Sequence, residues 1–177
     1  MPEYVGFVFW PKSQRYISLE TAETLKKILA PEILSVGVFV DEDPENIAAL
    51  TRRKIIDIIQ LHGREDEEYI SALRTLTGKI IIKVFKSGEV RKTSADYVMI
   101  DSGMGTGKTF DWSAVDLTPD INSPLFIAGG LTPENVRQAI HIFHPFAVDV
   151  SSGIETNGVK DIEKMTAFVE AVRKETL

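Results

Sequence analysis

The stretch of residues 124–155, PLFIAGGLTPENVRQAIHIFHPFAVDVSSGIE, constrains the fold of this chain most strongly. Two apolar runs of strand length, residues 125–128 and 146–150, flank a segment whose apolar side chains recur at helical spacing. Thr132 is the predicted N-cap of that helix, and Pro133 is its first residue. The pattern predicts a strand, a turn, a helix and a second strand parallel to the first.

Both predicted strands are followed by turns of small residues. Gly129 and Gly130 follow the first strand, and Ser151, Ser152 and Gly153 follow the second. Small residues let backbone N–H groups approach an anion closely, and a helix N-terminus adds partial positive charge. The loops after the last two strands of a (β/α)8 barrel commonly bind phosphate in this way, so the stretch predicts a phosphate site.

Strand-like and helix-like segments alternate through the rest of the chain. The other predicted strands cover residues 4–9, 35–40, 55–61, 79–85 and 96–100, and the other helices cover residues 19–30, 44–54, 65–76 and 161–174. The last helix is expected to turn five apolar side chains inward, those of Ile162, Met165, Phe168, Val169 and Val172.

This alternation indicates an all-parallel α/β protein. Seven strands suit either a compact barrel or an open doubly wound sheet, so their number does not decide between the two. The two consecutive phosphate-type turns favour the barrel, because an open sheet usually has one such site at its switch point. We therefore predict a (β/α)8 TIM-barrel type fold with seven βα units, forming one domain over residues 1–177.

Composition narrows the function classes. Twenty basic and 26 acidic residues give a net charge of −6, which argues against nucleic acid or an anionic membrane as a partner. The chain has no cysteine, so it has no disulfide and no cysteine-based metal site, and no His or carboxylate cluster has metal-site spacing. No signal peptide or transmembrane segment is recognised, which favours a cytoplasmic location.

The glycine-rich segment SGMGTGKT, residues 102–109, falls one residue short of a P-loop. The P-loop pattern requires glycine where this chain has Ser102, and no long apolar helix follows the segment. A mobile active-site loop explains these glycines better, with a short helix at residues 112–117.

Three polar side chains near strand ends are candidates for chemistry. Asp101 ends a strand and is either a general acid or base, or a cap for the following loop. Asp149 alternates with Ala147 and Ser151, which points it to the barrel interior, where ligand contact and indirect support are equally open. Arg15 follows the first strand and is either a carboxylate clamp or a solvated loop residue. His62 is more readily explained as a structural residue.

Several motifs together resemble the phosphoribosylanthranilate isomerase family of tryptophan biosynthesis. They are VGFVFWPKSQRYIS at residues 5–18, VGVFV at 36–40, QLHG at 60–63, VMIDSGMGTGKTFDW at 98–112, AGGLTPENV at 128–136 and AVDVSSGIE at 147–155. The resemblance runs from residue 5 to the last helix in the order found in the family.

The resemblance implies an Amadori rearrangement of N-(5′-phosphoribosyl)anthranilate to 1-(2-carboxyphenylamino)-1-deoxyribulose 5-phosphate, with no cofactor and no metal. Asp101 would be the general acid that opens the furanose ring, and Arg15 would hold the anthranilate carboxylate. Asp149 would support the site. The phosphate would be bound by Gly129, Gly130, Ser151, Ser152 and Gly153.

One departure from the family concerns the general base. Family members carry it as a cysteine in a K-x-C-G motif on their first strand, whereas this chain is expected to begin at the second strand and contains no cysteine. The resemblance therefore implies impaired activity, and a catalytically silent phosphate-ligand binding protein is the alternative. Self-association is expected through two exposed strand edges, at residues 4–9 and 146–150.

Overall fold

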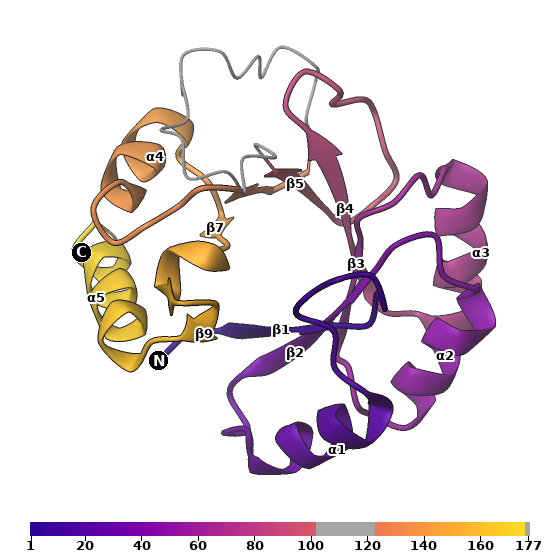
Figure 1. Ribbon diagram of the computed structural model, residues 1–177. Coiled ribbons are helices and arrows are strands. Elements are labelled where there is room, and N and C mark those ends of the chain that lie inside the picture. Colours follow the sequence, from indigo (N-terminus) through magenta and orange to yellow (C-terminus); the bar gives the residue numbers. More distant parts are fainter. Residues whose placement is uncertain (102–122, 176–177) are drawn as a thin grey trace. The chain divides into compact units, whose positions relative to one another are not determined.

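The computed structural model describes residues 1–101 and 123–175, and the predicted glycine-rich loop and short helix lie outside these residues. The chain divides into two compact units. Figure 1 labels the helices and strands that they contain. Unit 1 consists of Met1–Val84 and Thr93–Tyr97, and unit 2 of Phe85–Lys92 and Val98–Leu177. Among the described residues, no helix is long and apolar enough to cross a membrane.

Unit 1 alternates strands and helices as the sequence predicts. Its strands are β1 (Tyr4–Val8), β2 (Leu34–Phe39), β3 (Ile58–Leu61) and β4 (Ile80–Lys86, which runs into unit 2), and its helices are α1 (Leu19–Ile28), α2 (Pro44–Arg52) and α3 (Glu67–Thr77). Neighbouring strands pair in parallel in the order β1, β2, β3, β4. Their register aligns Gly6 with Val36, Val36 with Ile58, and Ile58 with Ile80. These are βα units with helical crossovers.

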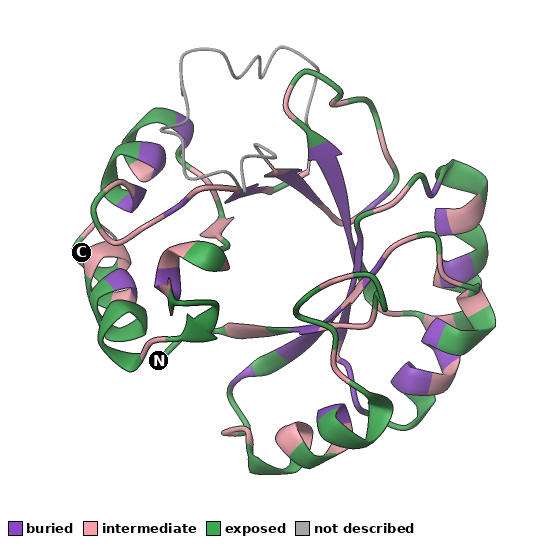
Figure 2. Ribbon diagram, in the orientation of Figure 1, coloured by how far each residue is buried: buried purple, intermediate pink, exposed green. Residues whose placement is uncertain are grey.

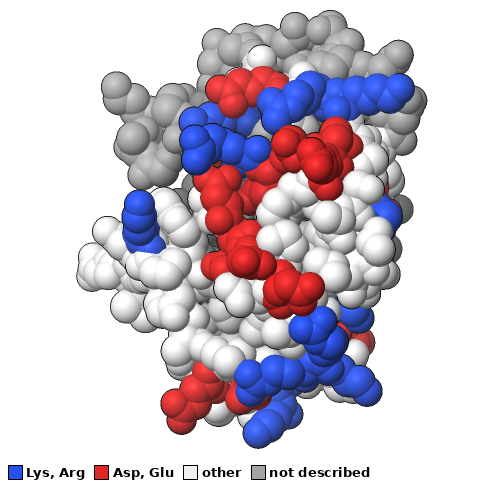
Figure 3. All heavy atoms as spheres, turned by 90° about the vertical axis from the view of Figure 1, so that its right-hand side faces the viewer, with Lys and Arg blue, Asp and Glu red and all other residues white. Residues whose placement is uncertain are grey.

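The helices of unit 1 are bounded by residues with strong capping preferences. The side chains of Ser18 and Asp43 accept hydrogen bonds from the first turns of α1 and α2. Gly78 ends α3 in the left-handed conformation, with φ of 60°. On the face shown in Figure 3, acidic side chains gather in a band. Glu45 of α2 and Glu67 of α3 lie in the first turns of their helices, where the helix dipole favours acidic side chains.

The core of unit 1 lies between its strands and helices. Phe39, Ile59 and Ile81 on the strands pack in one cluster with Ile70 and Leu73 of α3. Figure 2 shows the buried side of α2 and α3 opposite an exposed side. This distribution is the amphipathic pattern that the helical spacing predicts.

Unit 2 holds the later strands. They are β5 (Tyr97–Asp101, which begins in unit 1), β6 (Leu125–Ala128) and β7 (Ala147–Val148), followed by the short 3₁₀ helix η2 (Ser152–Ile154), the antiparallel pair β8 (Glu155–Thr156) and β9 (Val159–Lys160), and the helices α4 (Val136–Phe143) and α5 (Ile162–Arg173). β5 pairs in parallel with β6, and β6 with β7. Ile100, Ile127, Val136 and Phe168 belong to its apolar core.

Two expectations for unit 2 are wrong in part. Helix α4 begins at Val136, three residues later than predicted, although Thr132 Oγ1 accepts a hydrogen bond from Glu134 N at 3.3 Å, as an N-cap side chain does. On α5, Phe168 is buried and Val172 packs against the core, as expected, whereas Ile162 is 79% and Met165 is 38% exposed. Helical spacing places these side chains on adjoining parts of one surface, but it does not determine how far a neighbouring element covers that surface.

One side of β1 is already paired with β2, and its other side is partly covered. The β1 to β2 ladder uses the backbone groups of Glu3 and Phe9, so those of Val8 point away from β2. There the Val8 carbonyl accepts a hydrogen bond from Ile17 N at 3.0 Å, and Val8 forms a bridge with Tyr16. The loop after β1 therefore protects the end of this edge, and self-association through the remaining edge residues stays a prediction.

A carboxylate at the start of β3 ties together three elements of unit 1. Asp57 Oδ2 accepts hydrogen bonds from Lys26 Nζ on α1 at 2.5 Å and from Ser35 N on β2 at 2.9 Å. Partial burial alone would raise the pKa of Asp57, but these bonds outweigh it and hold the pKa below the usual 3.8. The ionised Asp57 carboxylate therefore stabilises the folded state.

We expect Asp57→Asn to lower the free energy of unfolding at pH 7 by about 1–2 kcal/mol, since it loses charge-assisted hydrogen bonds at a partly exposed site. Because the folded-state pKa is depressed, the stabilisation is complete above the unfolded pKa and is lost as pH falls through the folded pKa. Urea unfolding at pH 7 and at pH 3 should show the difference shrinking in acid. Glu32→Gln, at an exposed position, is the control. A difference that is constant with pH would contradict this explanation.

Candidate active site

The turn after β6, here called the glycine turn, consists of Gly129 and Gly130. Both have positive φ, 89° and 67° respectively, a conformation that favours glycine. Among the described residues, a Cβ atom on Gly130 would meet no atom within 4 Å, so one side of this turn is open with respect to them. The glycine turn therefore offers accessible backbone at the C-terminal end of β6, as the phosphate prediction requires.

Asn135 closes the loop that follows the glycine turn. Its Nδ2 donates to Gly130 O at 2.9 Å, and its Oδ1 accepts from Thr132 N at 2.8 Å. Val136 N then donates to Thr132 O at 3.0 Å. The two bonds of the Asn135 side chain therefore tie the start of α4 to the glycine turn.

The turn after β7, here called the serine turn, consists of residues 151–153, and its last two residues are the first two of η2. A Cβ atom on Gly153 would lie only 1.8 Å from Leu131 O, so this position admits glycine alone without a backbone shift. The serine turn thus packs directly on the backbone beside the glycine turn. The structure brings together the two turns that the sequence assigns to phosphate.

The β8–β9 hairpin supports the serine turn from one side. Lys160 Nζ donates to Ser151 O at 2.8 Å and lies 2.9 Å from Glu155 Oε1. Glu155 is 10% exposed and Lys160 is 46% exposed. Lys164 Nζ donates to Glu155 O at 2.8 Å. Sequence analysis missed these contacts, although two lysines closely following the small-residue turn were a signal.

Asp101 and Asp149 lie on the same face of the unit 2 strands. Asp101 is aligned with Ala128, and continuing the register of Ile127 with Val148 aligns Ala128 with Asp149. The bond from Asp149 N to Ile127 O, 2.9 Å long, supports this alignment. Strands lie about 4.8 Å apart, so the two Cα atoms are separated by roughly 10 Å. Asp101 is half-buried and Asp149 is exposed.

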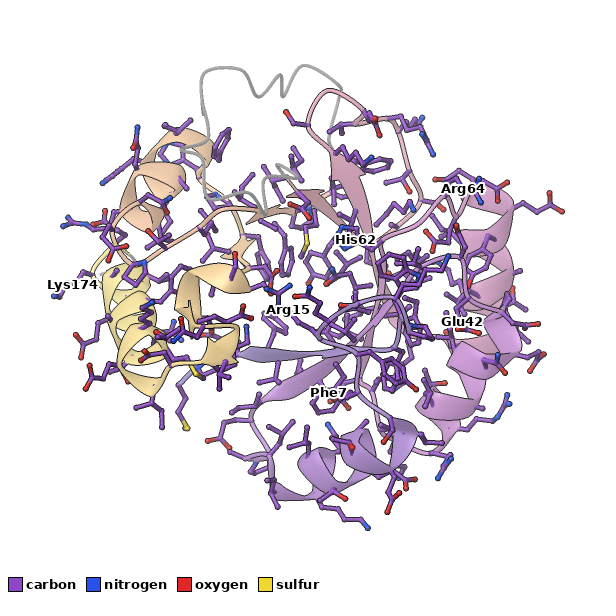
Figure 4. All side chains as sticks on the ribbon, in the orientation of Figure 1. Phe7, Arg15, Glu42, His62, Arg64 and Lys174 are labelled. Atoms are coloured by element: carbon purple, nitrogen blue, oxygen red, sulfur yellow. The ribbon has the colours of Figure 1, made fainter. Side chains whose placement is uncertain are left out.

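Arg15 and His62 come from unit 1, where they follow β1 and β3 (Figure 4). Both are exposed, and Arg15 N donates to Ser13 Oγ at 3.1 Å. The predicted site residues that the structure brings together within one unit are therefore Asp101, Asp149 and the two turns. Among residues 1–101 and 123–175, no group of three or more His, Asp or Glu side chains could hold a metal ion.

A profile described as N-(5'phosphoribosyl)anthranilate (PRA) isomerase matches residues 1–171 of this chain. The N-(5'-phosphoribosyl)anthranilate isomerase of Lacticaseibacillus casei (strain BL23) is 44% identical over 176 residues, which are 99% of this chain and 86% of that relative. This chain belongs to the N-(5'-phosphoribosyl)anthranilate isomerase family. Membership of this family confirms the prediction, made from the sequence motifs, of an isomerase of tryptophan biosynthesis.

Solved structures of the isomerase family support the fold. The crystal structure of phosphoribosyl anthranilate isomerase from Thermotoga maritima matches with a TM-score of 0.82 and 36% identity, covering 97% of this chain and 88% of that one. A family structure in complex with reduced 1-(o-carboxyphenylamino)-1-deoxyribulose 5-phosphate matches with a TM-score of 0.78 and 34% identity, with the same coverage. The predicted α/β fold of TIM-barrel type, with seven parallel strands in the described residues, is confirmed.

A buried ion pair beside the ends of β3 and β4 was not predicted. Lys83 Nζ lies 2.7 Å from Glu65 Oε2, with 2% and 1% of the two side chains exposed. Lys83 also donates to Gly63 O, and Glu65 accepts from Asp41 N and Gly63 N. A charged residue inside the apolar strand IIIKVF was the signal for it. Because both charges are paired and hydrogen-bonded, the Lys83–Glu65 pair holds Gly63 and the rest of the turn after β3 in place.

Proposed function

We propose that this chain catalyses the Amadori rearrangement of N-(5′-phosphoribosyl)anthranilate to 1-(2-carboxyphenylamino)-1-deoxyribulose 5-phosphate. The observation that carries the proposal is the pair of adjoining small-residue turns beside a strand-end carboxylate, Asp101, in one unit. A related structure is in complex with reduced 1-(o-carboxyphenylamino)-1-deoxyribulose 5-phosphate, a phosphorylated ligand. Incubating the purified chain with the substrate and following its conversion to the aminoketose tests the assignment.

We assign binding of the substrate phosphate to the backbone of the two turns. The residues involved are Gly129, Gly130, Ser151, Ser152 and Gly153. Backbone N–H groups in glycine-rich turns bind anions without adding a side chain that would have to be desolvated. With the phosphate bound at the two turns, the sugar ring of the substrate can extend toward Asp101 and Asp149 at the strand ends.

Asp101 is the proposed general acid. It gives a proton to the furanose ring oxygen as the C1′–O bond breaks, and the electron pair on the anthranilate nitrogen forms the C1′=N bond. Loss of the C2′ proton then gives an enolamine, which tautomerises to the ketone. Asp149 lies in the same row, where its carboxylate is proposed to support the site.

The group that removes the C2′ proton is left unassigned. The family resemblance places a cysteine in that role, and this chain has none. The absence of that side chain favours a second candidate, a catalytically silent protein that binds the phosphorylated ligand. Product binding without measurable turnover would support the second candidate, and turnover would exclude it.

Arg15 is proposed to bind the anthranilate carboxylate, since its guanidinium can pair with a carboxylate through two hydrogen bonds. We expect Arg15→Met to weaken binding of the anthranilate-containing product by about 10–100-fold, the range for a lost charge-assisted pair. Affinity for inorganic phosphate should stay within twofold. Isothermal titration with each ligand measures both values, and Lys12→Met in the same loop is the control. Equal losses for both ligands would show that Arg15 has another role.

We further propose that residues 1–177 act as a single domain in the cytoplasm, with a small phosphorylated molecule as partner and with neither nucleic acid nor membrane. The net charge of −6 supports the exclusion of polyanionic partners. Limited proteolysis, in which the two units are either cleaved apart or protected together, tests the domain proposal.

A further inference from the structure

Each of the two turns in unit 2 has one backbone carbonyl held by a side chain from a later segment. Asn135 Nδ2 donates to Gly130 O in the glycine turn, at 2.9 Å. Lys160 Nζ donates to Ser151 O in the serine turn, at 2.8 Å. Both side chains have a second bond that fixes them: Asn135 accepts from Thr132 N, and Lys160 pairs with Glu155.

These bonds control the direction of the neighbouring N–H groups. In a trans peptide unit, the C=O of one residue and the N–H of the next point in opposite directions, and the described residues contain no cis peptide. Holding Gly130 O therefore directs the Leu131 N–H away from Asn135, and holding Ser151 O directs the Ser152 N–H away from Lys160. Within the described part of the chain, no backbone carbonyl takes up the Leu131 N–H.

The two turns are also coupled to each other. Gly153 packs so closely on the backbone at Leu131 that a Cβ atom there would lie 1.8 Å from Leu131 O. Close-packed backbone of this kind transmits displacement instead of absorbing it. If either carbonyl lost its side-chain partner, the peptide unit could rotate and the neighbouring turn would follow.

We propose that Asn135 and Lys160 are positioning residues for the phosphate, each orienting one turn through its carbonyl so that the N–H of the same peptide unit faces the anion. Neither side chain needs to touch the phosphate. This inference rests on the proposed function of the two turns, and it identifies what keeps them ready to bind. Preorganised donors bind an anion more tightly because no reorientation has to precede binding.

The test titrates inorganic phosphate into the full chain and into Asn135→Ala and Lys160→Gln, at a temperature where circular dichroism shows all three folded. We expect the phosphate Kd to rise about fivefold to tenfold in each variant, the effect of losing one hydrogen bond. Lys160→Arg, which keeps a donor for Ser151 O, should recover most of the loss. If Asn135→Ala does not fold, the comparison of Lys160→Gln with Lys160→Arg tests the positioning role by itself.

Two controls separate positioning from general effects. Lys164→Gln removes the same charge from the same region, but Lys164 donates to Glu155 O and not to a turn. Asn46→Ala removes an asparagine whose Nδ2 bonds the Glu42 side chain in unit 1. Both controls should leave the phosphate Kd within twofold of wild type. The Lys160→Gln loss should also persist in 0.5 M salt, where the attraction of an exposed charge is screened.

The outcomes distinguish this inference from the function on which it rests. If the wild-type chain binds no phosphate, the proposed phosphate site itself is wrong. If the wild type binds phosphate and both variants bind it equally well, the site stands and the positioning role is wrong. A Lys160→Gln loss that Lys164→Gln reproduces, or that salt removes, would show a long-range charge effect and overturn the role of Lys160.

Discussion

Replacing Gly130 with aspartate is expected to abolish phosphate binding, raising the Kd by more than about 100-fold. The carboxylate would occupy the open side of the glycine turn, where the phosphate is proposed to sit, and like charges repel strongly at contact distance. Stabilisation of the wild type by phosphate at 100 times its Kd, about 2.7 kcal/mol, should disappear. Thermal unfolding with and without phosphate measures this change.

Gly130→Asn is the matched control for charge. It has the same shape as aspartate and the same cost of placing a side chain at φ of 67°, which asparagine tolerates among non-glycine residues. A Cβ at this position meets no neighbour in the part of the chain that the structure describes, so both variants should fold. Phosphate binding by Gly130→Asn should be weaker than wild type but clearly measurable. Undiminished phosphate protection in Gly130→Asp would refute the assignment of the glycine turn.

Replacing Asp101 with asparagine is expected to lower kcat by about 10²–10⁴-fold, the usual contribution of general acid catalysis. Asparagine keeps the shape of the side chain but cannot supply a proton to the ring oxygen. The phosphate Kd should be unchanged, because the phosphate is assigned to backbone groups of the two turns. Rates of product formation, compared with the wild-type chain under the same conditions, measure the effect.

Asp149→Asn is the control for Asp101→Asn, since both carboxylates lie in one row on the same strand face. We expect the kcat of Asp149→Asn to fall by less than that of Asp101→Asn. A larger loss in Asp149→Asn would move the acid role from the end of β5 to the end of β7. Equal phosphate affinity in both variants would show that the two turns remain intact.

The local features of the sequence were sufficient to predict most elements, with boundaries correct to within two residues except at the starts of β3 and α4. Ser18, Asp43 and Gly78 act at helix ends as their chemistry predicts, because a cap depends on residues within about one turn of the chain. The limits of β6 were predicted correctly for a similar reason, since an apolar run followed directly by Gly129 and Gly130 has few alternatives. The family motifs identified the isomerase because each motif is a short contiguous segment that can be read without the fold.

Features that join distant parts of the chain were not predictable. The pairing of Lys83 with Glu65 depends on how β4 lies beside the turn after β3, and the exposure of Ile162 depends on which elements cover α5. Asn135 was expected inside a helix, but it lies at the N-cap position and its side chain bonds back to Gly130. These three features depend on the tertiary structure, because hydrophobic periodicity specifies neither the partner of a polar group nor the element that covers a helix.

The sequence by itself determined the α/β alternation, the small-residue turns after β6 and β7, and the carboxylates at strand ends, because these depend on residue types a few positions apart. Only the tertiary structure decided that the two turns touch at Gly153 and that Asn135 and Lys160 hold their carbonyls. Strand register brings these groups within hydrogen-bond distance, and register is set by the packing of the whole unit.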